Sequence, residues 1–206
     1  MLTNILSFSI LLPTIAVFLT IWKQPKTLKK LSVFVLITAV LEATASFYVA
    51  HSINNMFLFH IYSYIEVIGI AWIYWNLIKG RLKIVIITLV TIFLLFSIIN
   101  IINWETLLEF NANQRYVGGM VITIFTLLYF SQIFIDAKIQ RIESDHYFWF
   151  SSILLIYTAG TLFLFILGKQ VHTEDNHMYW DLHNVLNVLL NIGFALTLWM
   201  GTKKSN

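Results

Sequence analysis

Seven apolar runs make up most of this chain, and their length constrains its fold more than any other feature. An α-helix rises about 1.5 Å per residue, so roughly 20 apolar residues cross the ~30 Å hydrocarbon core of a bilayer. The connectors between the runs are too short to hold a soluble domain. We therefore expect residues 1–206 to form a single all-α domain, a polytopic membrane protein built as a seven-transmembrane-helix bundle. The runs are Ile5–Trp22, Leu31–Val49, Phe57–Ile78, Leu82–Ile102, Val117–Ile135, Tyr147–Leu167 and Trp180–Met200.

The basic residues predict how this bundle is oriented. Eleven of the thirteen Lys and Arg residues follow the first, third, fifth and seventh runs, whereas only Arg115 and Lys169 follow the others. Cytoplasmic loops of membrane proteins are enriched in Lys and Arg. We therefore expect the N-terminus outside and the C-terminus in the cytoplasm. The eleven residues are Lys23, Lys26, Lys29, Lys30, Lys79, Arg81, Lys83, Lys138, Arg141, Lys203 and Lys204.

Composition supports a chain that has the lipid bilayer as its main partner. Hydrophobic residues make up 59% of the sequence and charged residues 11%, and the mean hydropathy is +0.80. The basic residues are spread over four helix ends instead of forming one stripe, which argues against nucleic acid as a partner. With no cysteine in the chain, disulfides, thiolate metal sites and cysteine nucleophiles are excluded.

Two carboxylates, Glu42 and Glu66, lie well inside predicted spans. A charge at the bilayer centre costs roughly 2.5 to 3.5 kcal/mol on insertion scales, so such residues usually have a function. Counting along the helices places both near the midplane, at about the level of Thr126, Thr158 and Asn191. The sequence thus predicts one polar layer to which five helices contribute.

The third run shows which way one of these carboxylates points. Apolar residues recur there at steps of three and four, which predicts a continuous lipid-facing stripe. Polar residues, including Glu66, occupy the rest of the helix circumference and are expected to face the bundle. The apolar stripe consists of Leu58, Ile61, Ile65, Ile68 and Trp72.

Polar stripes on other helices favour a shared pocket. The seventh run carries an asparagine stripe with His183 on its flank, and Ser46 lies on the same side of the second run as Glu42. We expect a pocket at mid-depth that opens to the outer face and is lined by the second, third, fifth, sixth and seventh helices. Its predicted residues are Glu42, Ser46, His60, Tyr62, Tyr64, Glu66, Thr126, Thr158, His183, Asn184, Asn187 and Asn191.

Two interpretations of this layer compete. The polar groups could simply join helices through hydrogen bonds worth about 0.6 kcal/mol each. A glutamine would serve that purpose without an ionisation cost, so the glutamates favour binding of a proton, an ion or a ligand. If Glu42 and Glu66 are adjacent, they are expected to share a proton, and if they are apart, His60 or His183 is the expected partner of one of them. Arg115 is expected to pair at the surface with Glu105 or Glu109.

Several enzyme and receptor classes lack their residues here. Apart from Lys83 at the very start of the fourth run, no lysine lies inside a span, so an attachment point for a retinal Schiff base is lacking. Seven-helix zinc hydrolases of the ceramidase and adiponectin-receptor type carry H-x-x-x-H on the last helix, but here the second ligand is replaced by an asparagine. The sixth connector is rich in His and acidic residues without a metal-ligand spacing, so neither a metal site nor a cofactor is predicted. These connector residues are His172, Glu174, Asp175 and His177, followed by Asp181 and His183.

Two segments carry a resemblance to a known group of proteins. The segments 54–66 (NNMFLFHIYSYIE) and 180–187 (WDLHNVLN) resemble small, uncharacterised seven-helix integral membrane proteins of Bacteroidota-type bacteria. The resemblance implies a location in the bacterial cytoplasmic (inner) membrane. It also implies importance for His60, Glu66, His183 and Asn187, but no reaction.

The sequence favours a membrane-embedded module that binds or senses a small molecule or an ion. A sensor with such short cytoplasmic loops needs a signalling partner in the membrane or the cytoplasm, and a homo-oligomer remains open. The first alternative is a small proton-coupled transporter or channel in which Glu42 and Glu66 carry the proton. The second alternative, an intramembrane metal-dependent hydrolase, is disfavoured by the missing histidine, and no catalytic residue is predicted.

Overall fold

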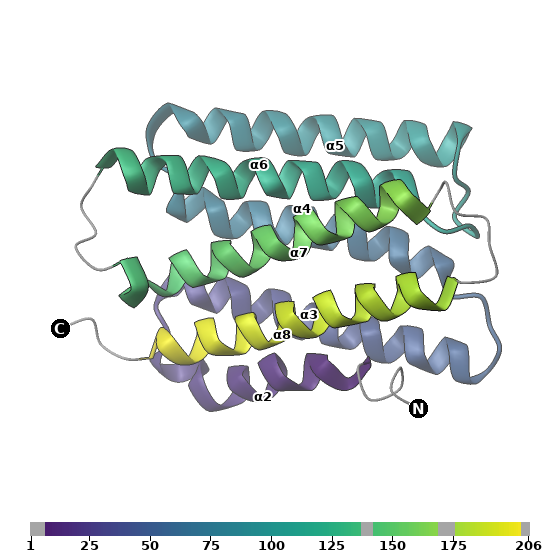
Figure 1. Ribbon diagram of the computed structural model, residues 1–206, viewed down its shortest axis with the longest axis horizontal. Coiled ribbons are helices and arrows are strands. Elements are labelled where there is room, and N and C mark those ends of the chain that lie inside the picture. The colour runs from purple at the N-terminus through teal and green to yellow at the C-terminus, as the bar shows by residue number, and fades with distance from the viewer. Residues whose placement is uncertain (1–6, 137–141, 169–175, 203–206) are drawn as a thin grey trace.

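A computed structural model of the chain describes residues 7–136, 142–168 and 176–202. Over these residues the protein is helical and contains no strand (Figure 1). The main helices match the predicted runs to within a few residues, because each apolar run continues as helix up to its polar flanks. The elements are η1 (Ser7–Ile10), α2 (Leu11–Thr20), η2 (Ile21–Lys23), α3 (Lys26–Ala50), α4 (Met56–Leu77), η3 (Gly80–Leu82), α5 (Lys83–Asn103), α6 (Ala112–Asp136), η4 (Ile142–Ser144), α7 (His146–Gly168) and α8 (Asn176–Met200).

Six of these helices, α3 to α8, are long and apolar enough to cross a membrane, which indicates an integral membrane protein. The first predicted span differs from the others. It forms a shorter apolar helical segment, Phe8–Lys23, in which 3-10 turns flank the ten-residue α2. The described chain is thus an all-helical bundle of six long helices and one short one.

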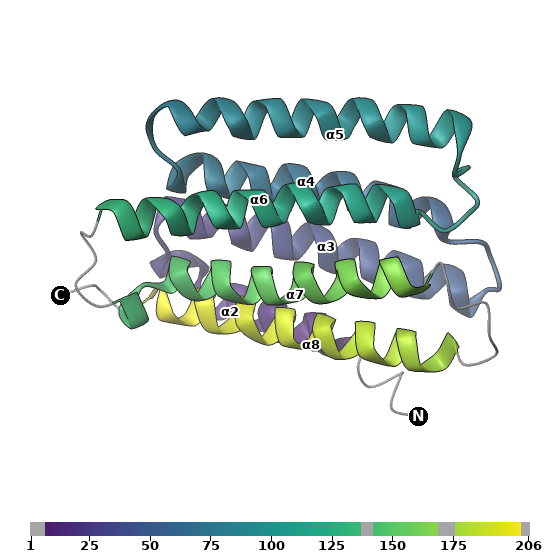
Figure 2. The ribbon, with the colours of Figure 1, turned by 45° about the horizontal axis from the view of Figure 1, so that its top comes forward.

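Six helices form a closed ring, and α5 lies outside it. Around the ring, α2 packs on α3, α3 on α4, α4 on α6, α6 on α7, α7 on α8, and α8 back on α2. The remaining helix α5 packs on α4 and α6 and lies along one edge of the bundle in both views (Figures 1 and 2). Few of its side chains are buried, which explains why the fourth apolar run is the least polar of the seven.

Close helix approach at two glycines helps to close this ring. A Cβ atom added to Gly160 of α7 would lie 2.7 Å from Leu186 of α8, and one added to Gly193 of α8 would lie 2.5 Å from Ile153 of α7. Small residues at such positions allow membrane helices to approach closely. The two glycines therefore leave room for the Leu186 and Ile153 side chains of the facing helix.

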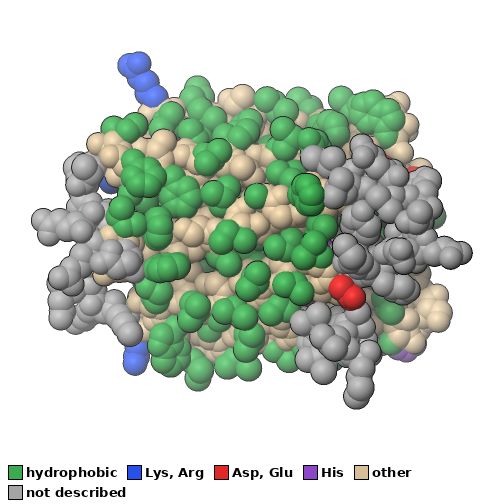
Figure 3. Space-filling model, viewed as in Figure 1, with side chains coloured by type: hydrophobic (Ala, Val, Ile, Leu, Met, Phe, Trp, Pro, Cys, Tyr) green, Lys and Arg blue, Asp and Glu red, His purple; other side chains and the backbone are tan. Residues whose placement is uncertain are grey.

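The antiparallel helices bring the basic connectors to one end of the bundle, which we call the basic end. It holds the described residues Lys23–Lys30 and Lys79–Lys83. In Figure 3 the visible Lys and Arg side chains lie at this end, while hydrophobic side chains cover most of the face between the two ends. The clustering agrees with the charge pattern of the sequence.

Large aromatic side chains fill the ring in the half near the basic end. The ring of Phe194 in α8 stacks on that of Phe150 in α7, with centroids 5.8 Å apart, and lies 6.1 Å from Phe34 of α3. Tyr74 of α4 continues the cluster, 5.8 Å from Phe150 and 6.1 Å from Phe125. These five side chains are at most 5% exposed. We refer to them as the aromatic plug.

The Tyr74 hydroxyl also joins three helices through neutral hydrogen bonds. It donates to the Ser151 hydroxyl of α7 at 2.9 Å and lies 3.2 Å from the Thr126 hydroxyl of α6. Thr126 in turn donates to the Ile122 carbonyl of its own helix. Every hydroxyl of this Tyr74–Thr126–Ser151 cluster therefore has a partner.

The exposed face of α4 agrees only in part with the predicted lipid stripe. Ile61, Ile68 and Trp72 are 41%, 46% and 47% exposed, as expected of a face in contact with acyl chains. Ile65 is half-buried, and the prediction for Leu58 was wrong, since this residue is 7% exposed. Leu58 lies in the first turn of α4. The connector between α5 and α6 hydrogen-bonds to the neighbouring residue Phe59.

Candidate functional site

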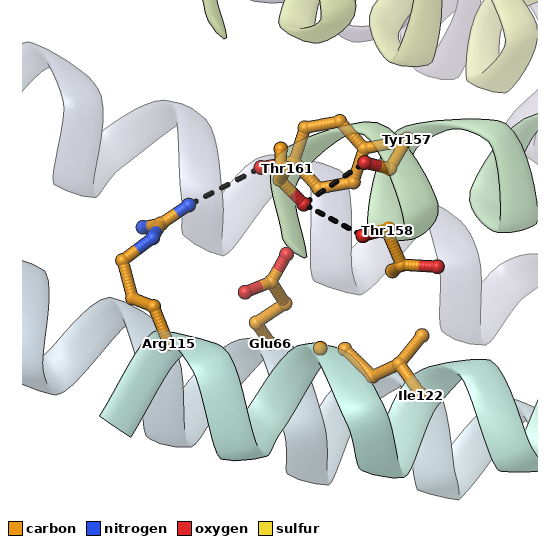
Figure 4. Close-up of a pocket in the computed structure, with 7 residues that line it drawn as sticks. Glu66, Arg115, Ile122, Tyr157, Thr158 and Thr161 are labelled. Carbon is orange, nitrogen blue, oxygen red and sulfur yellow. Dashed lines mark hydrogen bonds between the residues drawn. The ribbon is translucent and has the colours of Figure 1, made fainter. Parts of the chain in front are cut away.

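A small pocket lies between α4, α6 and α7, with one charged group on each of two helices (Figure 4). Glu66 reaches it from α4 and Arg115 from α6, and both point toward the α7 side chains in the close-up. The space open to the centre of a water molecule is about 10 Å³, roughly what a single water requires. The lining residues are Glu66, Arg115, Gly119, Ile122, Tyr157, Thr158 and Thr161.

Arg115 organises the charged side of the pocket. Its guanidinium donates to the Tyr157 hydroxyl at 3.2 Å and lies 5.5 Å from the ring centroid of Tyr62, a cation–π distance. It also interacts electrostatically with Glu66, whose side chain is 9% exposed. The buried carboxylate thus has a cation from the neighbouring helix instead of the predicted histidine.

Glu42 of α3 lies near the same two tyrosines. The Asn187 side chain of α8 is its hydrogen-bonding neighbour, and its buried atom Oε2 has no hydrogen-bond partner among the described residues. The hydroxyl groups of Tyr62 and Tyr157 interact electrostatically with both Glu42 and Glu66. The two tyrosines therefore lie close to both carboxylates.

His183 completes the group on α8. Its ring centroid lies 6.4 Å from that of Tyr157, and the side chain is close enough to Arg115 to interact with its charge. Glu42, Tyr62, Glu66, Arg115, Tyr157, His183 and Asn187 together form what we call the charged cluster. It occupies the half of the ring away from the basic end, and the aromatic plug fills the other half.

The structure therefore brings together six of the predicted pocket residues, from four helices. Neither carboxylate points outward into the surrounding lipid, since Glu66 is buried and Glu42 is half-buried. The six residues are Glu42, Tyr62, Glu66, Thr158, His183 and Asn187.

Three other predicted pocket residues lie elsewhere. Tyr64 faces α5, where its ring meets Phe93 at 5.9 Å, because two residues along a helix turn the side chain about 200° away from Glu66. Thr126 belongs to the Tyr74–Thr126–Ser151 cluster. Asn191 lies one turn beyond Asn187 and donates to Ser9 of η1 at 2.8 Å. Helix phase thus separates Tyr64 from the pocket, whereas Thr126 and Asn191 lie further along their helices toward the basic end.

His60 also lies apart from Glu66, in a network near the start of α6. Its Nδ1 is 2.8 Å from Gln114 Oε1, and its Nε2 is 3.2 Å from the Glu109 carbonyl. Asn111 extends this network to Ser63 at 2.8 Å. His60 is therefore not the partner of Glu66, because six residues along a helix separate the two directions by about 120°.

The last two predicted residues lie toward helix ends. Ser46 is exposed, since neighbouring helices leave most of the final turn of α3 uncovered. Asn184 is half-buried in α8. Neither residue lines the pocket.

The expected pairing of Arg115 with Glu105 or Glu109 was also wrong. Both carboxylate oxygens of Glu105 accept the backbone N–H of Asn113, at 2.8 and 3.1 Å, and so cap the first turn of α6. The Glu109 carboxylate accepts the backbone N–H of Thr106. With both carboxylates engaged in the loop, Arg115 turns into the bundle.

The predicted pocket did not include the lining residues Arg115, Gly119, Ile122, Tyr157 and Thr161. The signal for two of them was helical spacing, because Arg115 and Gly119 lie eleven and seven residues before Thr126 and hence on one face of α6. Tyr157 precedes the predicted Thr158, but an aromatic residue in an apolar run gave no reason to single it out.

A metal centre finds no support in the described part of the chain, where no three His, Asp or Glu side chains come together. The connector residues His172, Glu174 and Asp175 lie outside the described residues, and the side chain of His177 is likewise not described.

Comparisons with known proteins add no family. No family model, no curated protein and no solved structure matches this chain. The resemblance to Bacteroidota-type membrane proteins therefore stays a prediction. The function has to be argued from the charged cluster and the surrounding ring.

Proposed function

We propose that this protein is a membrane-embedded module that binds a proton or a small ion in the charged cluster and acts as a sensor. In this proposal the N-terminus is outside, so that the pocket faces the outer side. The observation that carries the proposal is that Glu66 and Arg115 line one water-sized space and interact electrostatically there, within helices long and apolar enough to cross a membrane. Such charges are costly at this depth and mark functional sites.

The size of the pocket supports a proton or small ion over a larger ligand. About 10 Å³ of space for a water centre leaves no room for a drug-sized molecule. Glu42 is the better candidate for taking up the proton. Its Oε2 has no hydrogen-bond partner within the described part of the chain, whereas Glu66 already faces the Arg115 cation. A carboxyl group without a cation at this depth gains by becoming neutral.

The aromatic plug supports binding and sensing over conduction. A conducting pathway would have to cross the half of the ring that is filled by the plug residues Phe150 and Phe194, which stack on each other. A pocket that is closed on that side admits and releases its ligand through the same opening. Changes at Glu42 would then reach a partner protein through α3 and α8.

Infrared spectroscopy of the full chain in lipid nanodiscs tests the proposal. A buried carboxylic acid gives a C=O band distinct from that of a hydrated one, and this band should titrate between acidic and alkaline pH. We expect Glu42→Gln to remove the main component. The matched control is Glu109→Gln, which removes a carboxyl group from the loop and should leave the buried band intact. A buried band that survives both Glu42→Gln and Glu66→Gln would contradict proton binding here.

Proton-coupled transport is a second candidate, favoured by the two tyrosines. The hydroxyls of Tyr62 and Tyr157 lie close enough to both Glu42 and Glu66 to interact with their charges, and tyrosine hydroxyls can both donate and accept a proton. Proteoliposomes that contain a pH-sensitive dye distinguish this function from sensing. Proton flux that is lost in Glu66→Gln and retained in Glu109→Gln would establish transport and reject a closed pocket.

A further inference from the structure

Two lysines from different helices converge on α4 at the basic end. Lys30 of α3 places Nζ 4.7 Å from the ring centroid of Trp72, and Lys83 of α5 places Nζ 4.8 Å from that of Trp75. Both tryptophans belong to α4 and are three residues apart, so they lie on one side of it. α4 packs against both α3 and α5. The two ammonium groups therefore approach the same surface of α4 from opposite sides.

This arrangement gathers two positive charges. Lys30 and Lys83 are close enough to repel each other, and among the described side chains no carboxylate acts on Lys30 beside them. Lys30 donates to the Trp72 carbonyl at 2.9 Å, which uses one of its three N–H donors. A bound anion would relieve the repulsion and accept the remaining hydrogen bonds.

The surface next to the lysines is apolar and continues toward the middle of the bundle. Trp72 and Trp75 are 47% and 38% exposed, and Ile68 and Ile61 extend the exposed face of α4 away from the basic end. Tryptophans at such a position are typical of the membrane–water interface. A ligand that fits this surface has an anionic group at the lysines and hydrocarbon chains along Ile68 and Ile61.

We infer that Lys30, Trp72, Trp75 and Lys83 form a binding site for an anionic phospholipid, with its phosphate between the two ammonium groups. Basic pockets between membrane helices commonly bind phospholipid headgroups. The occupant is a lipid and not free phosphate, because the exposed stripe of α4 provides a place for acyl chains. The site is independent of the charged cluster, which occupies the other half of the bundle.

Native mass spectrometry of the full chain in mild detergent tests this site. Phosphatidylglycerol and phosphatidylcholine with identical acyl chains are titrated separately. Each lysine near a membrane surface contributes about a fivefold gain in affinity for anionic lipid. We therefore expect Lys30→Gln/Lys83→Gln to weaken the first phosphatidylglycerol roughly 20-fold. Phosphatidylcholine binding should be nearly unchanged.

Matched variants keep the outcome clear. Lys26→Gln/Lys29→Gln removes the same charge from exposed positions at the same end and should retain tight binding. Lys30→Arg/Lys83→Arg keeps the charge and should restore most of the affinity, which separates lost binding from misfolding. An equal loss in both glutamine pairs would overturn the site in favour of general attraction. Displacement of the lipid by millimolar inorganic phosphate would overturn its assignment to a lipid.

Discussion

The two halves of the helix ring use polar groups in opposite ways, although the same helices α4, α6 and α7 build both. Near the basic end, the Tyr74–Thr126–Ser151 cluster is neutral, has a partner for every hydroxyl and lies against tightly packed aromatic rings. In the other half, the same helices bring Glu66 and Arg115 to a space for water, and one oxygen of Glu42 in α3 has no hydrogen-bond partner among the residues that the structure describes.

This difference shows what the ring needs in order to close. Neutral hydroxyls and aromatic packing are sufficient to join α4, α6 and α7, as the half near the basic end demonstrates. Charges are therefore not required for helix association in this protein. The charged cluster is better explained by binding, and substitutions in the two halves should separate stability from function.

The largest expected effect is that of Phe194→Ala in the aromatic plug. The substitution removes a ring that stacks on Phe150 and leaves a cavity. We expect a loss of about 3 kcal/mol in the free energy of unfolding, at the low end for such substitutions because lipid solvates the exposed ring better than water does. Reversible unfolding in detergent–lipid micelles measures it. Phe163→Ala, at an exposed position of α7, is the control and should change little.

Arg115→Met comes next and tests the charged half directly. Without its cation, Glu66 must either remain charged in a buried site or take up a proton. We expect a loss on the order of 2 kcal/mol at neutral pH, less than for a fully buried pair because Arg115 is only partly buried. The loss should shrink as the pH falls, since a protonated Glu66 no longer needs the cation. A loss that is equal at all pH values would show that Arg115 acts through packing alone.

Tyr74→Phe should have a smaller effect, because it keeps the ring and removes only the hydroxyl. Thr126 and Ser151 lose one partner each, and we expect a loss of roughly 0.6 to 1 kcal/mol in the free energy of unfolding. The buried infrared carboxyl band should be unchanged. A change in that band would break the separation between the two halves.

Glu66→Gln should have the smallest effect on stability. Glutamine keeps the shape of the side chain and removes the cost of burying a charge, although it also leaves Arg115 without its anion. We expect these changes to offset each other to within about 0.5 kcal/mol, while the carboxyl titration and any proton flux change. A loss as large as that of Phe194→Ala would mean that the charged cluster holds the ring together after all.

The sequence predicts the helices well because lipid imposes a simple rule on each span. The predicted runs matched α3 to α8. The exposed residues Ile61, Ile68 and Trp72 correctly predicted that Glu66 faces away from the lipid. The first run was predicted as a full span but is a shorter helix with 3-10 turns at both ends. The length of an apolar run alone does not predict where an α-helix gives way to 3-10 turns or where it ends.

The site was harder to predict than the helices. Depth and phase identified Glu42, Glu66, Thr158, His183 and Asn187, but the order of helices around the ring does not follow from periodicity. Thr126 and Thr158 have similar depths but different neighbours. Arg115 was missed because the apolar run begins at Val117, whereas the helix begins at Ala112. The loop contacts that extend α6 by this turn depend on tertiary structure.

The capping of α6 by Glu105 has a consequence for the pocket that reaches beyond the loop. Glu105 fixes the backbone of Asn113, only two residues before Arg115, and a helix turns about 100° with each residue. A shift of a single residue in where α6 begins would swing the guanidinium away from Glu66. The direction in which the pocket arginine points is thus set by an acidic side chain at the end of the bundle. Substitutions in that loop therefore alter the pocket without contacting it.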